Sequence, residues 1–240
     1  MSGRPRRDEH TELTRRAVLD AAASRFADPG FAATTIDAIA RAARVSKGAV
    51  YHHFADKASL YEALWRDREE AVLASVRAAA QRRADPWARL DAAIATYVEA
   101  VASDPVHRAL LAQGPVALGP GRWRELDTEL AVAVLLEAVE AAEATGRLRR
   151  ARGEMLARVL TSAMREAAMT AGDAGGEGTG TRADGGSEGA AARAARHEAT
   201  SVLTTLTAGL RGRPLSAPGL PGSQGWTAAD SPTGHRGTAR

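Results

Sequence analysis

Apolar side chains along this chain recur every three or four residues, which is the spacing of one buried face on an α-helix. In the first such segment, residues 11–27, the spacing places Val18, Ala22 and Phe26 on one face. Pro29 and Gly30 end the segment, because proline cannot continue a helix and glycine readily forms the following turn. Alanine is abundant and runs of β-branched residues are scarce, so the sequence predicts an all-α protein.

Two short amphipathic segments, residues 34–43 and 47–53, follow this first helix. Thr35 and Ser46 stand where hydroxyl side chains commonly cap the first turn of a helix. The positions expected to face a small core are Ile36, Ile39, Ala40, Ala43, Val45, Val50 and Phe54. This arrangement predicts a helix-turn-helix over about residues 34–53, whose second helix enters a major groove of DNA.

Longer helical segments make up the rest of the chain. Asp56 can cap a fourth helix that reaches about residue 83. Its apolar positions shift in phase, as expected for a connecting helix that packs on two domains. Gly114 and Pro115 are expected to end a short sixth helix. The helices expected after the fourth cover residues 86–103, 106–113, 122–145, 153–171 and 190–210.

Composition limits the class of protein. The apolar fraction of 45% is typical of a globular chain, and the lack of cysteine excludes disulfides and cysteine-ligated zinc. No apolar run approaches the roughly 18 residues of a membrane span, and the N-terminus lacks the apolar core of a secretory signal. We therefore expect a cytoplasmic protein without a membrane partner. A flexible basic arm at 1–10, a disordered Gly-rich loop at 172–189 and a disordered tail at 211–240 are also expected.

The excess positive charge lies at the N-terminal end. Residues 1–57 contain ten Arg or Lys and seven Asp or Glu, which accounts for the whole net charge of +3. Both lysines of the chain, Lys47 and Lys57, lie in this region. A basic end suits a partner that carries phosphates. Chance in an arginine-rich chain is an equally open explanation, so charge alone does not decide the partner.

Residues 47–53 carry the candidate chemistry for reading DNA. Lys47 can donate to guanine O6 and N7 or to a phosphate, and Ala49 can contact a thymine methyl group. The small side chains of Gly48 and Ala49 let the helix backbone approach the bases closely. Tyr51 can donate to a phosphate, although it could instead only cover the core.

His52 and His53 can also donate to phosphates. A metal site is the alternative, but adjacent helical residues diverge by about 100°, and no carboxylate or cysteine is spaced to join them. The sequence therefore predicts no metal site. It also contains no phosphate-binding glycine loop and no cysteine nucleophile, so we expect neither an enzyme nor a cofactor.

The segments TTIDAIA and VSKGAVYHHFADKASL resemble the DNA-binding domain of the TetR family of bacterial transcriptional regulators. The segment VLDAAASRFADPGF is similar to that family's first helix, and the match covers residues 11–64. The resemblance implies a three-helix DNA-binding domain at 11–56, joined by a long helix to a helical ligand-binding and dimerisation domain at 57–210. The expected DNA-binding residues are Thr35, Arg44, Ser46, Lys47, Gly48, Ala49, Tyr51, His52, His53 and Lys57.

Three of these residues, Thr35, Lys57 and Arg44, lie outside the second helix of the helix-turn-helix. Thr35 is primarily a helix cap whose hydroxyl can also meet a phosphate. Lys57 matches the position where the N-terminus of the family's fourth helix binds a phosphate. Arg44 stands where the family usually has a glycine in the left-handed conformation, which costs another residue roughly 1–2 kcal/mol. The turn could relax there, or Arg44 could offset the cost by contacting a phosphate.

The resemblance also implies an effector held between the fifth to eighth helices. The candidate residues are Tyr97, Val101, Leu111, Gln113, Trp123, Leu126, Leu130, Met164 and Met169. Mostly apolar with a few polar groups, this set suits a small, largely apolar effector, although for each residue taken singly ordinary core packing is the favoured explanation.

The last two helices, at about 153–171 and 190–210, are apolar over a wide face. The resemblance implies a homodimer through them, and completion of the monomer core is the alternative. A dimer is favoured because a single helix-turn-helix makes too few base contacts for specific binding. The expected function is a dimeric repressor that an effector releases from a palindromic site on double-stranded DNA. An activator or an effector-independent DNA-binding protein is the alternative.

Overall fold

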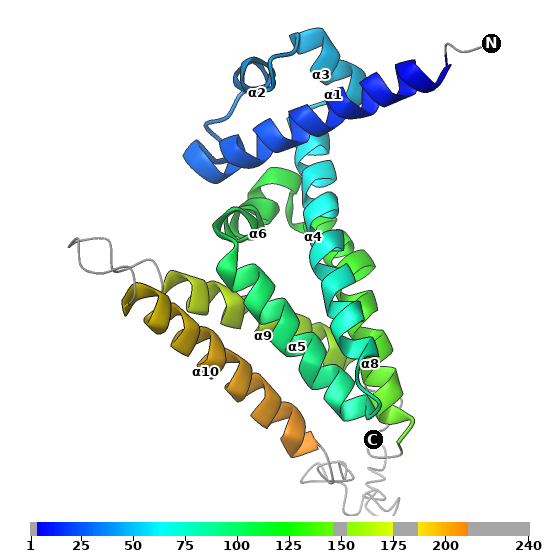
Figure 1. The fold of residues 1–240 in the computed structure, drawn as a ribbon, viewed down its shortest axis with the longest axis vertical. Helices are drawn as coiled ribbons and strands as arrows, with labels where there is room; N and C mark the ends of the chain where they lie inside the picture. Colours follow the sequence, from blue (N-terminus) through cyan, green and yellow to red (C-terminus); the bar gives the residue numbers. More distant parts are fainter. Residues whose placement is uncertain (1–3, 146–152, 175–186, 211–240) are drawn as a thin grey trace, which may run out of the picture.

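The computed structural model describes residues 4–145, 153–174 and 187–210, with side chains described from residue 9 onward and, in the last part, from residue 189. All regular elements in these parts are helical, which confirms the all-α prediction (Figure 1). In chain order they are α1 Arg4–Arg25, the π-helical segment η1 Phe26–Gly30, α2 Ile36–Ala43, α3 Lys47–His53, α4 Lys57–Gln81, α5 Pro86–Ser103, α6 Pro105–Leu118, α7 Pro120–Asp127, the π-helical segment η2 Thr128–Val132, α8 Ala133–Glu143, α9 Gly153–Asp173 and α10 Ser187–Leu210.

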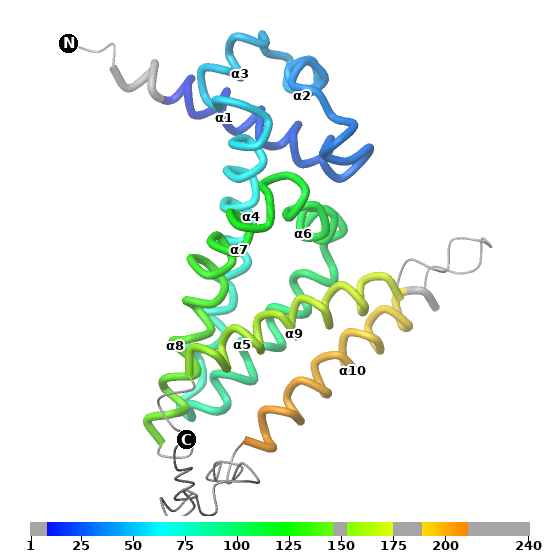
Figure 2. Tube along the Cα trace, turned by 180° about the vertical axis from the view of Figure 1, so that it is seen from behind, coloured from blue at the N-terminus to red at the C-terminus, as the bar shows by residue number. Residues whose placement is uncertain are grey.

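The helices form an N-terminal three-helix unit and a larger C-terminal unit, which α4 connects (Figures 1 and 2). In the C-terminal unit, α5 packs against α4, α8 and α9. The last helix, α10, packs against α9 and α5 at the outside of the bundle. Within the described residues, no helix is both long and apolar enough to cross a membrane.

The N-terminal unit follows the predicted pattern of apolar positions. Val18, Ala22 and Phe26 from the first helix are buried together with Ile39 of α2 and Val50 of α3. The helix starts are fixed by side-chain caps. Thr35 Oγ1 accepts a hydrogen bond of 3.2 Å from the Ala38 amide, and Ser46 Oγ accepts one of 3.1 Å from Ala49. These capping predictions are confirmed.

Helix α4 packs on both units, as its phase shift predicts. Its first turns bury Leu60 and Leu64, and its later turns bury Leu73 and Val76. Asp56 caps it through a reciprocal pair of hydrogen bonds with Ser59, so the predicted start is confirmed.

The structure differs from the sequence prediction in two places, the N-terminal arm and the predicted loop at 172–189. Residues 4–10 belong to α1 instead of a flexible arm, because Pro5 falls in the first turn, where its missing N–H costs no hydrogen bond. Gly172 is buried in α9, where a Cβ atom would meet the Arg108 side chain. Residues 172–174 and 187–189 are therefore not part of a disordered loop. The remainder of that predicted loop and the predicted tail lie outside the described residues.

The predicted end of the sixth helix at Gly114 and Pro115 is wrong, since α6 continues to Leu118. The glycine at position 114 instead leaves room for the Trp123 ring, which a Cβ atom there would overlap. The predicted helix at 122–145 starts at Pro120 and is interrupted by the wider turn of η2.

Candidate DNA interface and ligand cavities

Helix α3 presents a polar face to solvent. Val50 and Phe54 hold it to the core, while Lys47, Gly48 and His52 are exposed. Tyr51 is 48% exposed, so its ring projects outward instead of covering the core. Ala49 and His53 are half-buried beside this face. The structure therefore brings six of the predicted DNA-binding residues onto one short helix.

Lys47 has a partner that the sequence prediction missed. Its Nζ lies 3.0 Å from a carboxylate oxygen of Asp37 in α2, and both side chains are about half exposed. The hydrogen bond to Asp37, followed by the charge attraction, raises the pKa of Lys47. Asp37 therefore holds Lys47 in place and competes with any phosphate or guanine for its ammonium group.

The turn between α2 and α3 has the conformation that normally favours glycine. Arg44 has φ 57° and ψ 38°, so the turn does not relax to accommodate the arginine. The Arg44 amide donates to the carbonyls of Ala40 and Arg41, which ends α2 in a regular cap. Its side chain is exposed.

The Lys57 side chain is used within the protein. Its Nζ donates to the carbonyl oxygens of Phe31 at 2.7 Å and Thr34 at 2.9 Å, and lies 4.2 Å from the centre of the Phe31 ring. These contacts hold the loop before α2 against the start of α4. A phosphate at this position would therefore meet the backbone amides of the α4 N-terminus rather than a free lysine.

The histidine pair differs in environment. Partial burial, followed by the charges of His52 and Arg15, lowers the pKa of His53. The two rings lie 5.3 Å apart at a steep angle. Within the described residues, no group of three His, Cys, Asp or Glu side chains is placed to hold a metal ion.

Two of the nine effector candidates share an interior cavity. Tyr97 and Met164 line a space of about 10 Å³ between α4, α5, α8 and α9, together with Thr161 and the π-helical residue Ala131. The candidates Val101, Leu111 and Leu126 are buried in the core without lining this cavity, and Leu130 and Met169 are half-buried against that core. Trp123 packs on Trp65, with their ring centres 4.8 Å apart.

Gln113 is the candidate that lies elsewhere, at the junction of the two units. Its Nε2 donates to the Phe26 carbonyl at 2.9 Å, and its Oε1 accepts from the Phe31 amide at 2.5 Å. Gln113 therefore does not line the interior cavity that Tyr97 and Met164 share. The residue faces η1 because α6 packs against that segment.

A buried group of charged side chains lies beside the interior cavity. Glu69 is fully buried, with one carboxylate oxygen 3.0 Å from His107 Nε2 and the other 3.5 Å from Arg165. Arg165 also pairs with Asp127 at 2.7 Å. The Tyr97 hydroxyl donates to Glu69 at 3.4 Å, which links this group to the cavity wall. We call these five residues the ion network.

Burial governs the chemistry of the ion network. It raises the pKa of Asp127 despite the nearby Arg165 charge, and it raises the pKa of the Tyr97 hydroxyl. The sequence does not reveal this network, because its members come from different helices. One signal was present: Glu69 stands between Trp65 and Leu73 at four-residue spacing, on the buried stripe of α4.

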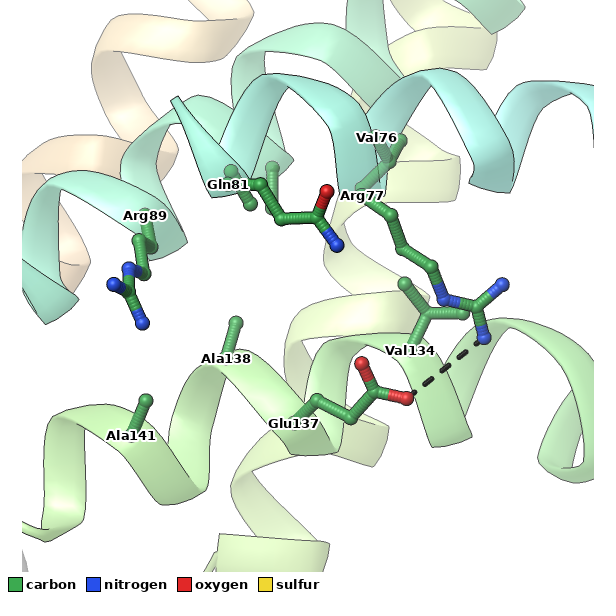
Figure 3. Close-up of a pocket in the computed structure, with 10 residues that line it drawn as sticks. Val76, Arg77, Gln81, Arg89, Val134, Glu137, Ala138 and Ala141 are labelled. Carbon is green, nitrogen blue, oxygen red and sulfur yellow. Dashed lines mark ion pairs between the residues drawn. The ribbon is translucent and has the colours of Figure 1, made fainter. Parts of the chain in front are cut away.

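A second cavity, of about 200 Å³, lies at the far end of α4 (Figure 3). Arg77 and Gln81 reach it from α4, and Arg89 reaches it from α5. Helix α8 forms the opposite wall, where Glu137 lies 3.8 Å from Arg77. The sequence analysis did not foresee this cavity, which depends on how three helices diverge.

Parts of the chain match two protein-family models. Residues 18–64 match the model described as "Bacterial regulatory proteins, tetR family". Residues 87–184 match the "Tetracyclin repressor-like, C-terminal domain". The two matches fall on the N-terminal unit with the start of α4 and on the C-terminal unit, respectively.

Curated relatives share mainly the N-terminal part. Identity is 35% over 96 residues with the HTH-type transcriptional repressor KstR2 of Rhodococcus jostii, which covers 40% of this chain and 46% of that protein. It is 36% over 64 residues with the HTH-type transcriptional regulator AcrR of Shigella flexneri, covering 27% and 30%. The chain thus spans less than half the length of these relatives.

Solved structures are similar over most of the fold. A TetR-family transcriptional regulator from Pectobacterium atrosepticum has a TM-score of 0.64 and 22% identity, covering 86% of this chain and 98% of that one. FadR from Bacillus subtilis, solved in complex with stearoyl-CoA, has a TM-score of 0.63 and 14% identity, covering 79% and 97%. At these identities the similarity concerns the fold alone.

Proposed function

Because this chain belongs to the TetR family of bacterial transcriptional regulators, we propose that it is a dimeric repressor that a small effector releases from a palindromic DNA site. The observation that carries the proposal is the exposed polar face of α3, mounted on a buried apolar face. Such a helix can enter the major groove while its core contacts keep it rigid. No catalytic step is part of this function.

The residues of α3 divide into two roles. Lys47 and Ala49 reach base edges, because they stand at the start of the helix, where the backbone at Gly48 carries no side chain. Tyr51 and His52 hold the adjacent phosphates. Thr35, Arg44 and Ser46 lie at the neighbouring helix end and turn, where they meet the same DNA backbone.

Dimerisation supplies a second copy of α3 for the second half of a palindromic site. Four large apolar side chains on the outer helices are exposed: Met155 (65%) and Val159 (56%) of α9, and Val202 (55%) and Leu206 (60%) of α10. Each pair is four residues apart and so lies on one helix face. An exposed apolar face on two adjacent helices supports burial against the same helices of a second copy.

Effector control uses the contacts between the two units. An effector in the interior cavity lies against Tyr97, which is bonded to Glu69 of α4. Glu69 in turn contacts His107 of α6, the helix whose Gln113 holds η1 of the N-terminal unit. Movement in the ion network is therefore transmitted to the unit that carries α3.

The test is selection of bound DNA from a random pool at a stated salt concentration, followed by affinity measurements on the selected sequence. We expect two inverted half-sites, bound by one dimer. Enrichment of a single half-site, or of no sequence, would contradict the proposal.

A further inference from the structure

We infer that the two cavities of the C-terminal unit form one channel that binds an aliphatic chain carrying an anionic head group. The chain enters the interior cavity, and the head group stays at the arginines of the outer one. This inference rests on the proposed function, because it names the chemical class of the effector.

The two cavities share a wall. Val76 of α4 and Val134 of α8 line both the outer cavity of about 200 Å³ and the interior cavity of about 10 Å³. The outer cavity exceeds the roughly 150 Å³ of an apolar cavity that holds benzene, whereas the interior one is the size of a single water. The side chains of Val76 and Val134 therefore lie between the two cavities.

Most of the residues that line the two cavities are apolar. Besides the shared valines, alanine side chains form the floor of the outer cavity, at Ala80, Ala93, Ala138 and Ala141. Leu73, Leu135 and Met164 continue this lining inward. Small side chains outside and larger, flexible ones inside suit a narrow alkyl chain better than a rigid aromatic ring system.

The mouth of the outer cavity is positively charged. Two guanidinium groups, Arg77 and Arg89, reach it against one carboxylate, Glu137. The Arg77–Glu137 distance of 3.8 Å is too long for a strong charged hydrogen bond. Among the described residues, the Arg89 side chain forms one hydrogen bond, from its Nε to the Arg83 carbonyl at 2.8 Å. Both arginines therefore keep N–H donors for an anionic head group (Figure 3).

Two features of the interior cavity suit opening on binding. The Thr161 hydroxyl lies on its wall, 2% exposed, and has no hydrogen-bond partner among the described residues. A wall that leaves a buried hydroxyl unpaired is less tightly fixed than a fully bonded core. The wall also includes Ala131 of η2, where the π-helical turn interrupts the regular hydrogen-bond ladder.

The inference is tested by titration calorimetry of the full chain with hexanoate, octanoate and decanoate below micelle-forming concentrations. We expect affinity to rise by about fourfold per added methylene group. Octanoate should bind at least tenfold more tightly than 1-octanol or octyltrimethylammonium. Equal affinities across the series, or preference for the cationic chain, would overturn the inference.

Variants locate the binding in the channel. Val134→Trp fills the shared wall and should remove the gain between octanoate and decanoate. Ala138→Leu, a milder change in the outer cavity, should weaken all three carboxylates about tenfold. Arg89→Gln should weaken octanoate and leave 1-octanol unchanged, whereas Arg82→Gln, outside the cavity, should change neither. If Ala138→Leu and Arg89→Gln are folded by circular dichroism and bind octanoate as the unmodified protein does, the channel is not the site.

DNA binding separates this inference from the function on which it rests. If the unmodified protein binds a selected palindrome but none of the alkyl probes, the channel inference fails and the DNA-binding function stands. If it binds octanoate through Arg89 but selects no DNA sequence, the proposed repressor function fails and the channel stands.

Discussion

Replacing Gln113 with leucine should loosen the junction between the two units. The substitution keeps the side-chain size and removes two hydrogen bonds to the N-terminal unit, those to the Phe26 carbonyl and the Phe31 amide. Each such bond contributes about 0.5–1.5 kcal/mol, and the groups left behind are partly buried. We therefore expect the free energy of unfolding to fall by about 1–3 kcal/mol.

Hydrogen exchange gives the more specific measurement of the same change. The free energy of the opening that exposes the Phe31 amide should fall by a similar amount, which accelerates exchange of this amide roughly 5- to 150-fold. Amides in the middle of α9 should change only with global stability. Gln113→Glu keeps an acceptor for Phe31 but loses the Nε2 donor to Phe26, so exchange at Phe31 should stay closer to that of the unmodified protein.

Gln81→Leu is the matched control, because this exposed glutamine of α4 makes no contact with the N-terminal unit. It should leave exchange at Phe31 unchanged. If Gln113→Leu also leaves both the unfolding free energy and the Phe31 exchange rate at their original values, Gln113 does not hold the two units together and the reasoning is refuted.

Three further predictions concern DNA reading, pH and assembly. Lys47→Ala should weaken binding to the selected operator roughly 5- to 150-fold and relax the preference at one base pair. An equal loss of affinity for all sequences in this variant would show a phosphate contact instead. Asp37→Asn should strengthen binding, because it frees Lys47. Burial raises the folded-state pKa of Asp127 above its ordinary 3.8, so the folded protein holds this proton more tightly than the unfolded chain does. The free energy of unfolding should therefore fall as pH rises from about 4 through that raised pKa. Urea titrations at a series of pH values should show that Asp127→Asn removes this fall, and an unchanged pH slope in the variant would contradict the assignment. Val202→Glu should convert the proposed dimer to a monomer in analytical ultracentrifugation, while Val116→Glu, at an even more exposed valine on α6, should not. A dimeric Val202→Glu protein would exclude this face.

The N-terminal unit could be predicted from the sequence because its determinants are local. Thr35, Ser46 and Asp56 cap the helices that directly follow them, and the apolar spacing identifies the buried face of each short helix. The family resemblance marked Arg44 as a candidate left-handed residue, and its φ of 57° excludes the alternative that the turn relaxes. These features need information from only a few neighbouring positions.

The interior sites could not be predicted because they depend on how distant helices pack. Nothing beside Glu69 in the sequence indicates that His107 and Arg165 will meet its carboxylate. The position of Gln113 on α6 is compatible with either a ligand cavity or a contact with η1. Only the packing of α6 against η1 decides between them. Cavities are harder still to predict from sequence, because they form where side chains from several helices leave a space unfilled.

Helix α6 carries the connection between these two kinds of feature. His107 at its start contacts Glu69 of the ion network, and Gln113, six residues later, holds the loop before α2. A straight helix places these residues about 9 Å apart along its axis and moves them together. Pro115 lacks the N–H that would bond to the Leu111 carbonyl, so α6 is weakest in the turn from Leu111 to Pro115, which contains Gln113. A ligand that moves Glu69 while the Glu69–His107 pair holds would shift the start of α6, and this shift would reach Gln113 and the loop before α2 to the extent that this turn stays rigid.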